Sequence, residues 1–127
     1  MENEEMQRLI ERYLSAYNTF DIQGMLDVLD EEIRFLNVAR GEVTTETLGI
    51  ADFRALAEQS VPIFSERRQT IRQIGFTQGG AEVEIDYEAT LAVDLPNGMQ
   101  AGEVLQLRGK SVFQKKGEKL VRIEDHS

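Results

Sequence analysis

The sequence predicts an α+β fold in which three helices pack on a strongly curved antiparallel sheet and enclose one central pocket. Apolar residues recur at helical spacing near the start of the chain and again around residues 50–64, and they alternate from residue 68 onward. Turn residues separate the alternating segments. A sheet with one apolar face needs a cover, which amphipathic helices supply, and a curved sheet of this kind leaves a cleft at its open end.

Two helices are expected before the first strand. Asn18-Thr19 ends the first one, and Asp21 suits the N-cap of a short second helix. The charged run Asp30–Glu32 is expected to end that second helix. The apolar stripe of the first helix consists of Met6, Leu9, Ile10, Tyr13, Leu14 and Tyr17.

The middle of the chain predicts two short strands and a third helix. The period of two in Ile33–Asn37 favours a strand, and Gly41 turns the chain into a second strand at Val43–Leu48. Apolar residues from Ile50 to Phe64 then recur at helical spacing. Pro62 is expected to kink or end this helix near its last turn.

From Arg68 the chain reads as four strands joined by hairpins. The turns fall at Gly79-Gly80, at Leu95–Gly98 and at Lys116-Gly117. Pairing through the second of these turns places Asp86 opposite Arg108 and Glu84 opposite Lys110 on the outer face. We therefore interpret the acidic row in this strand as a ladder of cross-strand charge pairs and not as a cation site.

Composition limits the function classes. The 127 residues fit a single domain, residues 1–127, and a net charge of −9 argues against nucleic acid and anionic membranes as partners. The absence of cysteine excludes disulfides and thiol chemistry, and one histidine, His126, excludes a multi-histidine metal site. We expect no metal and no cofactor. Without an apolar stretch at the start or of membrane-spanning length, a cytoplasmic location is expected.

Two segments of the sequence resemble a known family. ERYLSAYNTFDIQGMLDVLDEEIRFLN, from Glu11 to Asn37, is similar to the opening helix pair and first strand of the SnoaL-like branch of the nuclear transport factor 2-like superfamily. LRGKSVFQKKGEKLVRIEDHS, which ends the chain, is similar to its final hairpin. The branch includes polyketide cyclases and ketosteroid isomerases. The resemblance implies a cone-shaped, cystatin-like fold, and a homodimer formed through the outer sheet face.

The resemblance also assigns roles by position. Tyr13 matches a tyrosine that donates to an oxyanion in the isomerases, but Asn37 stands where those enzymes have their aspartate base. Gly109 stands where they have a second carboxylic acid. Because asparagine cannot accept a proton from carbon at neutral pH, steroid isomerisation by that mechanism is not expected.

Three residues are candidates for catalysis: Tyr13, Asn37 and Asp125. Asp125 reaches the inner face if Leu120 takes an outer or rim position; its alternative is a solvated acid in a fraying terminal strand. Tyr13 and Asn37 also fit purely structural roles in the core and at a strand end. The residues expected to line the pocket are Tyr17, Phe35, Phe53, Tyr87, Leu107, Phe113 and Ile123.

Arg67 and Arg68 begin the first of the four late strands. One of them could reach the mouth of the pocket and hold an anionic ligand, because a guanidinium binds a carboxylate with two parallel hydrogen bonds. On an acidic protein, pairing with surface carboxylates is the simpler interpretation.

The leading functional hypothesis is a pocket protein that binds a small apolar or amphipathic molecule. One alternative is a cofactor-independent lyase, isomerase, cyclase or hydrolase, which a buried Asp125 beside Tyr13 would favour. The other is a dimerisation or scaffold domain without catalysis, in which Phe35, Tyr87 and Phe113 fill the pocket.

Overall fold

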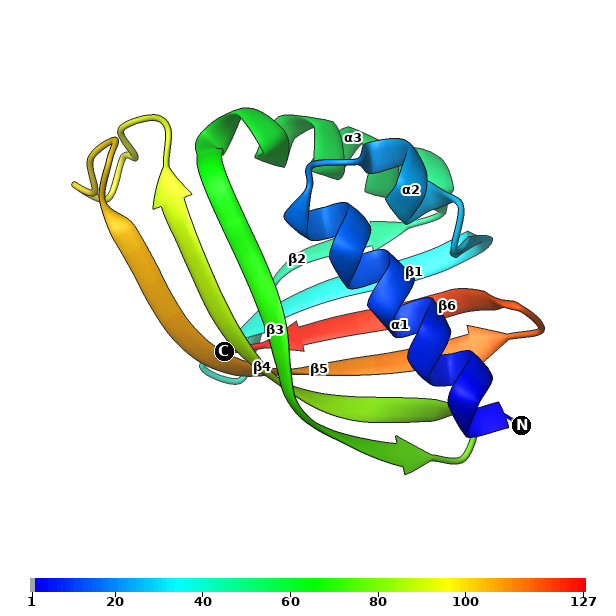
Figure 1. Cartoon of the computed structure of the whole chain (residues 1–127). Helices are drawn as coiled ribbons and strands as arrows, with labels where there is room; N and C mark the ends of the chain where they lie inside the picture. Colours follow the sequence, from blue (N-terminus) through cyan, green and yellow to red (C-terminus); the bar gives the residue numbers. More distant parts are fainter. Residues whose placement is uncertain (1) are drawn as a thin grey trace.

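The computed structural model describes residues 2–127 and confirms the α+β fold, with three helices packed on a six-stranded curved sheet (Figure 1). The elements follow the expected order of two helices, two strands, a helix and four strands. Their bounds are α1 Glu2–Asn18, α2 Ile22–Leu26, β1 Leu29–Ala39, β2 Glu42–Leu48, α3 Ile50–Ser60, the 3-10 turn η1 Val61–Ile63, β3 Phe64–Thr77, β4 Gly80–Leu91, β5 Val104–Lys116 and β6 Lys119–His126.

The sheet is curved and mostly antiparallel, as expected, but one parallel pair makes it mixed. Its strands lie in the order β2-β1-β6-β5-β4-β3. β6 pairs in parallel with β1 on one side and antiparallel with β5 on the other, while the remaining pairs are antiparallel. Hairpin turns report only on strands adjacent in sequence, and nothing local to either strand indicates that the last one lies beside the first.

The helices lie against the concave side of the sheet, and the core fills the space between them (Figure 1). Ile10 of α1, Ile33 of β1 and Ile123 of β6 have no exposed surface. Removing side chains of this size from water is worth roughly 1.5–3 kcal/mol each. The expected apolar stripe of α1 is therefore the surface that holds it to the sheet.

Two local predictions about helix ends are confirmed. Asp21 caps α2, with its carboxylate accepting a hydrogen bond from the Gly24 backbone N–H at 2.9 Å. α3 ends at Ser60, and Pro62 lies in the 3-10 turn that follows. The charged run Asp30–Glu32 does not end α2, as expected, but forms the start of β1. Its neighbour Leu29 is buried opposite Leu120 of β6, which extends the strand past the charges.

The predicted register on the outer face of the sheet is confirmed. Asp86 lies opposite Arg108, and Glu84 lies opposite Lys110. Asp86 pairs with Arg108 at 3.6 Å, whereas Lys110 reaches diagonally to Glu82 at 2.8 Å. Each exposed pair contributes little to stability, but a shift of one residue would separate all of them.

Candidate functional site

Asp125 lies on the inner face near the end of β6, and this strand does not fray. β6 is held between β1 and β5, and the Ser127 N–H donates to the Val38 carbonyl at 2.9 Å. In β5, the Ser111 hydroxyl donates to Asp125 Oδ1 at 2.7 Å. The alternative of a solvated acid in a loose terminal strand therefore does not hold.

Asp125 faces the interior as expected, but the position expected for Leu120 was wrong. Leu120 is completely buried and does not occupy an outer or rim position. The pairing of β5 with β6 shifts between Gln114 and Lys115, and this irregularity adds a residue to the alternation. Both Leu120 and Ile123 therefore face the core, and Asp125 follows Ile123 on the same face.

Burial changes the acidity of Asp125. Desolvation raises the pKa of the carboxyl from 3.8 to about 6, while the Ser111 hydrogen bond and the charge of His126 act in the opposite direction. The side chain is nevertheless partly accessible. Asp125 is thus a carboxylate at neutral pH that accepts a proton more readily than an ordinary surface aspartate.

Tyr13 of α1 lies across the interior from this strand. It is buried between Phe53 of α3 and Phe113 of β5, with ring centroids 6.3 and 6.2 Å away. Desolvation, and then the negative charge of Asp125, raise the pKa of Tyr13, so its hydroxyl remains a neutral donor. Among the described residues no hydrogen-bond partner of this hydroxyl contributes to its pKa.

The other two tyrosines of the chain meet in the same interior. The hydroxyls of Tyr17 in α1 and Tyr87 in β4 lie 3.0 Å apart and form a hydrogen bond. Burial raises the pKa of both phenols. All three tyrosines therefore present uncharged hydroxyl groups on the concave side of the sheet.

The simpler interpretation of Arg67, in which it pairs with surface carboxylates, was wrong. Only 5% of its surface is exposed, and it lies on the inner face of β3 opposite Ala89. Its Nε donates to the Tyr17 backbone carbonyl at 2.8 Å. Its neighbour Arg68 is exposed, because alternation along a strand places successive side chains on opposite faces.

Asn37 is beside Asp125 but is engaged elsewhere. The two residues are partners in the parallel pairing of β1 with β6. The Asn37 side-chain amide donates to the Thr44 hydroxyl at 2.9 Å, near the edge of the sheet. This arrangement satisfies the amide within the protein and gives it no evident contact with the interior.

The residues expected to line the pocket divide into two groups. Phe53, Phe113 and Ile123 are closed into the core, whereas Tyr17, Phe35 and Tyr87 are partly buried. Leu107 is 50% exposed although it lies beside Tyr87 on the inner face. The pairing of β5 with β6 ends at Lys110, so no residue of β6 lies beside Leu107. The inner face is therefore uncovered at this end.

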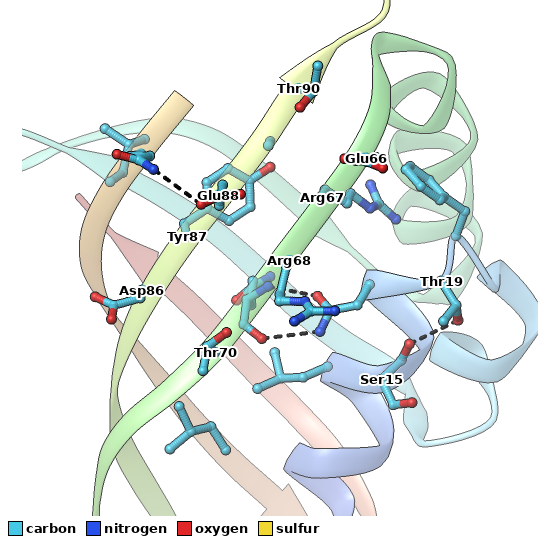
Figure 2. Close-up of a pocket in the computed structure, with 18 of the residues that line it drawn as sticks. Ser15, Thr19, Glu66, Arg67, Arg68, Thr70, Asp86, Tyr87, Glu88 and Thr90 are labelled. Carbon is cyan, nitrogen blue, oxygen red and sulfur yellow. Dashed lines mark hydrogen bonds between the residues drawn. The ribbon is translucent and has the colours of Figure 1, made fainter. Parts of the chain in front are cut away.

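A groove of about 1150 Å³ lies against β3, β4 and the end of α1 (Figure 2). Figure 2 shows Arg68 and Thr70 on β3 facing Ser15 of α1 across it. Of the predicted site residues, only Tyr87 and Leu107 border this groove. Its carboxylates are exposed, and Asp86 is already paired with arginines, so they have ordinary surface chemistry. The chemically distinctive groups lie on the concave side, around Asp125.

Ser111 was not predicted as part of the site, and Arg67 was predicted only as one of two arginines that could reach the mouth of the pocket. Ser111 shares the inner face of β5 with Leu107 and Phe113, and a hydroxyl in an otherwise apolar row was the available signal. For Arg67 the available signal was the alternation along β3, which begins at Phe64 and not at Arg68. Within residues 2–127, no cluster of histidine, aspartate and glutamate side chains could hold a metal ion. The helices in that range are also too short or too polar to cross a membrane.

These features define a cone-shaped α+β domain with a polar cluster on an otherwise apolar concave surface. A sequence model of the SnoaL-like domain matches residues 10–123, and the chain belongs to this family. A search of curated protein sequences found no match.

Solved structures share the fold at low sequence identity. A candidate polyketide cyclase from Xanthomonas campestris pv. campestris superimposes with a TM-score of 0.78 and 19% identity, covering 98% of this chain and 90% of its own. A ketosteroid isomerase-like protein from Catenulispora acidiphila DSM 44928, in complex with trimethylamine, gives 0.77 and 10%, covering 94% and 84%. A cystatin-fold protein from Novosphingobium aromaticivorans gives 0.71 and 15%, covering 93% and 94%. These likenesses show that the chain has a cystatin-like fold.

Proposed function

We propose that the concave side of the cone binds a small amphipathic molecule and that Asp125 moves a proton to or from it. The observation that supports this most strongly is the pKa of about 6 at Asp125, close to the operating pH, on an inner face bordered by neutral phenols. This combines the leading hypothesis of ligand binding with the enzyme alternative. Tyr13 and Asp125 belong to it, whereas the hydrogen bond to Thr44 leaves Asn37 without a role.

The chemistry follows from the protonation states. A carboxylate can remove a proton from carbon next to a carbonyl group, and the negative charge then develops on the carbonyl oxygen. Tyr13 is a neutral donor in the same interior and can stabilise that oxygen by a hydrogen bond. Returning the proton to another carbon, or forming a carbon–carbon bond from the enolate, gives isomerase or cyclase chemistry without a cofactor.

Exchange of carbon-bound hydrogen with solvent tests the proposal. We would incubate the protein with 2-tetralone in D₂O and follow loss of the α-hydrogen signals by proton NMR. The exchange is expected to rise as pH increases through about 6, because Asp125 acts as a base only when ionised. Asp125→Asn is expected to lower the protein-dependent rate by roughly 10²-fold or more.

Two further variants make the test specific. Ser111→Ala removes a hydrogen bond that stabilises the carboxylate, so it is expected to raise the pKa of Asp125 and move the pH midpoint upward. Glu124→Gln, the adjacent acid, lies beside Arg122 and His126 and is expected to leave the rate unchanged. Equal protein-dependent rates for Asp125→Asn and the parent protein would contradict the proposed role.

A further inference from the structure

Arg67 is a buried cation whose guanidinium is clamped in place. Its Cζ lies 3.7 Å from the centroid of the Tyr17 ring and 4.6 Å from that of the Phe20 ring. The hydrogen bond from Nε to the Tyr17 carbonyl fixes the group further. These contacts set the orientation of the guanidinium plane before any ligand arrives.

The charge of Arg67 is not balanced within the described part of the chain. Arg34, Arg72 and Arg122 each lie within ion-pair distance of a carboxylate, whereas Arg67 is found in no such pair among residues 2–127. Its Nη2 is buried and has no hydrogen-bond partner there. A buried charge without a counter-charge is unfavourable, and an unsatisfied donor adds to that cost.

A second donor lies close to this cation. The positive charge of Arg67 acts on both Tyr17 and Tyr87, lowering the pKa that burial raises. Their mutual hydrogen bond uses one hydroxyl proton and leaves the other available for an acceptor. Arg67 and Tyr87 also both border the groove along β3, which supplies a route from solvent.

We propose that Arg67 and the Tyr17–Tyr87 hydroxyl pair bind the carboxylate of a small organic acid. This inference rests on the proposed function and names the class of its ligand. One fixed positive charge matches a monoanion better than a phosphate dianion, and the planar guanidinium matches a carboxylate.

Asp125 lies near this subsite, because its negative charge contributes to raising the pKa of Tyr87. The charge of Arg67 acts on Tyr13 but is not among the causes that shift the pKa of Asp125. In this arrangement the ligand has its carboxylate at Arg67 and its reacting carbon towards Asp125.

Matched acid and amide probes test the assignment. We would titrate 3-phenylpropionate and 3-phenylpropionamide into the protein at pH 8 and measure the Kd of each by NMR. The acid is expected to bind at least about tenfold more tightly, as charge-assisted pairing predicts. Arg67→Gln is expected to abolish this preference, and Arg68→Gln, its exposed neighbour, to retain it.

A second variant tests the subsite even if Arg67→Gln does not fold. Tyr87→Phe removes one hydroxyl of the pair and is expected to weaken the acid about threefold or more while changing the amide little. Equal affinities of the two probes for the parent protein would overturn the carboxylate subsite. An undiminished preference for the acid in folded Arg67→Gln would overturn it as well, and so would displacement of the acid by inorganic phosphate at equal concentration.

Asp125→Asn separates this inference from the proposed function. If it abolishes hydrogen exchange but keeps the preference for the acid, both stand. If exchange persists while the preference is kept, the proton-transfer role fails and the carboxylate subsite stands. If neither probe binds at millimolar concentration while the parent protein still exchanges the α-hydrogens of 2-tetralone, the carboxylate subsite fails and the proton-transfer role stands.

Discussion

The chain contains three tyrosines, and the structure brings all of them into one interior where burial keeps their phenols neutral. Tyr17 and Tyr87 were expected there because each shares a face with apolar neighbours, and Tyr13 because of its helical spacing. Their relation to Asp125 and Arg67 depends on which strands are neighbours in the sheet. Residue spacing predicts the face of an element, and the pairing of distant strands decides what that face meets.

Alkaline titration tests the tyrosine cluster. Free tyrosine is half ionised near pH 10, but a raised folded-state pKa keeps these phenols protonated at that pH. Absorbance near 295 nm at pH 10 is expected to show much less phenolate in the folded protein than after unfolding in urea, where about half of the phenols are ionised. The chain has no tryptophan to obscure the signal.

The direction of the pH effect on folding stability follows from the difference between the folded and unfolded pKa values of the tyrosines. The neutral phenols contribute to stability up to their unfolded pKa, and this contribution is lost as pH rises towards the higher folded values. The cluster would be contradicted if two of the three tyrosines ionised at pH 10 while the circular dichroism spectrum remained native.

At the scale of elements, most of the helices and hairpins could be predicted and the parallel pair could not. Asp21, Pro62 and the Asp86–Arg108 register are encoded locally by cap chemistry, proline geometry and turn length. The insertion of β6 between β1 and β5 has no local signal. Because β6 lies between these two strands, it is a central strand of the sheet, and Asp125 therefore lies in the interior.

Gly109 is the residue on which the packing of β5 against the end of β6 most visibly depends. A Cβ added there would lie 2.6 Å from the His126 carbonyl oxygen, which is backbone and cannot turn aside. Gly109→Ala is expected to lower the free energy of unfolding by about 1–3 kcal/mol, as overpacking does, measured by urea denaturation.

Gly75 provides the matched control in another strand. The nearest atom to a Cβ at this position is the Glu82 carbonyl oxygen at 4.0 Å, an ordinary contact distance. Gly75→Ala is expected to be neutral or slightly stabilising, because alanine loses less conformational freedom on folding than glycine. Equal urea midpoints for the two variants would show that the β6 end does not press on β5.

At the scale of the whole molecule, we propose a homodimer formed through the outer face of the sheet. The family resemblance implies it, and Val104 leaves 55% of its surface exposed on β5 beside the charged pairs of that face. Light scattering after gel filtration is expected to give about twice the chain mass of 14.4 kDa at micromolar concentration. Val104→Lys is expected to shift the mass towards the monomer.

Val43 of β2 is the control for that substitution, because it is equally exposed at 55% but lies in an edge strand that is separated from β5 by β1 and β6. Val43→Lys is expected to leave the mass unchanged. A monomer mass for the parent protein, or dissociation caused equally by both variants, would rule out this interface.

We propose that Asp125 is a proton-transferring group in the interior of the cone. The most direct measurement is an NMR titration of the ¹³C-labelled carboxyl carbon of Asp125 in the folded protein, with Ser111→Ala in parallel. A midpoint near pH 6, moving upward in Ser111→Ala, is the predicted result. A midpoint near 4, the ordinary value for aspartate, would contradict the account, because the carboxyl would then be a solvated surface acid.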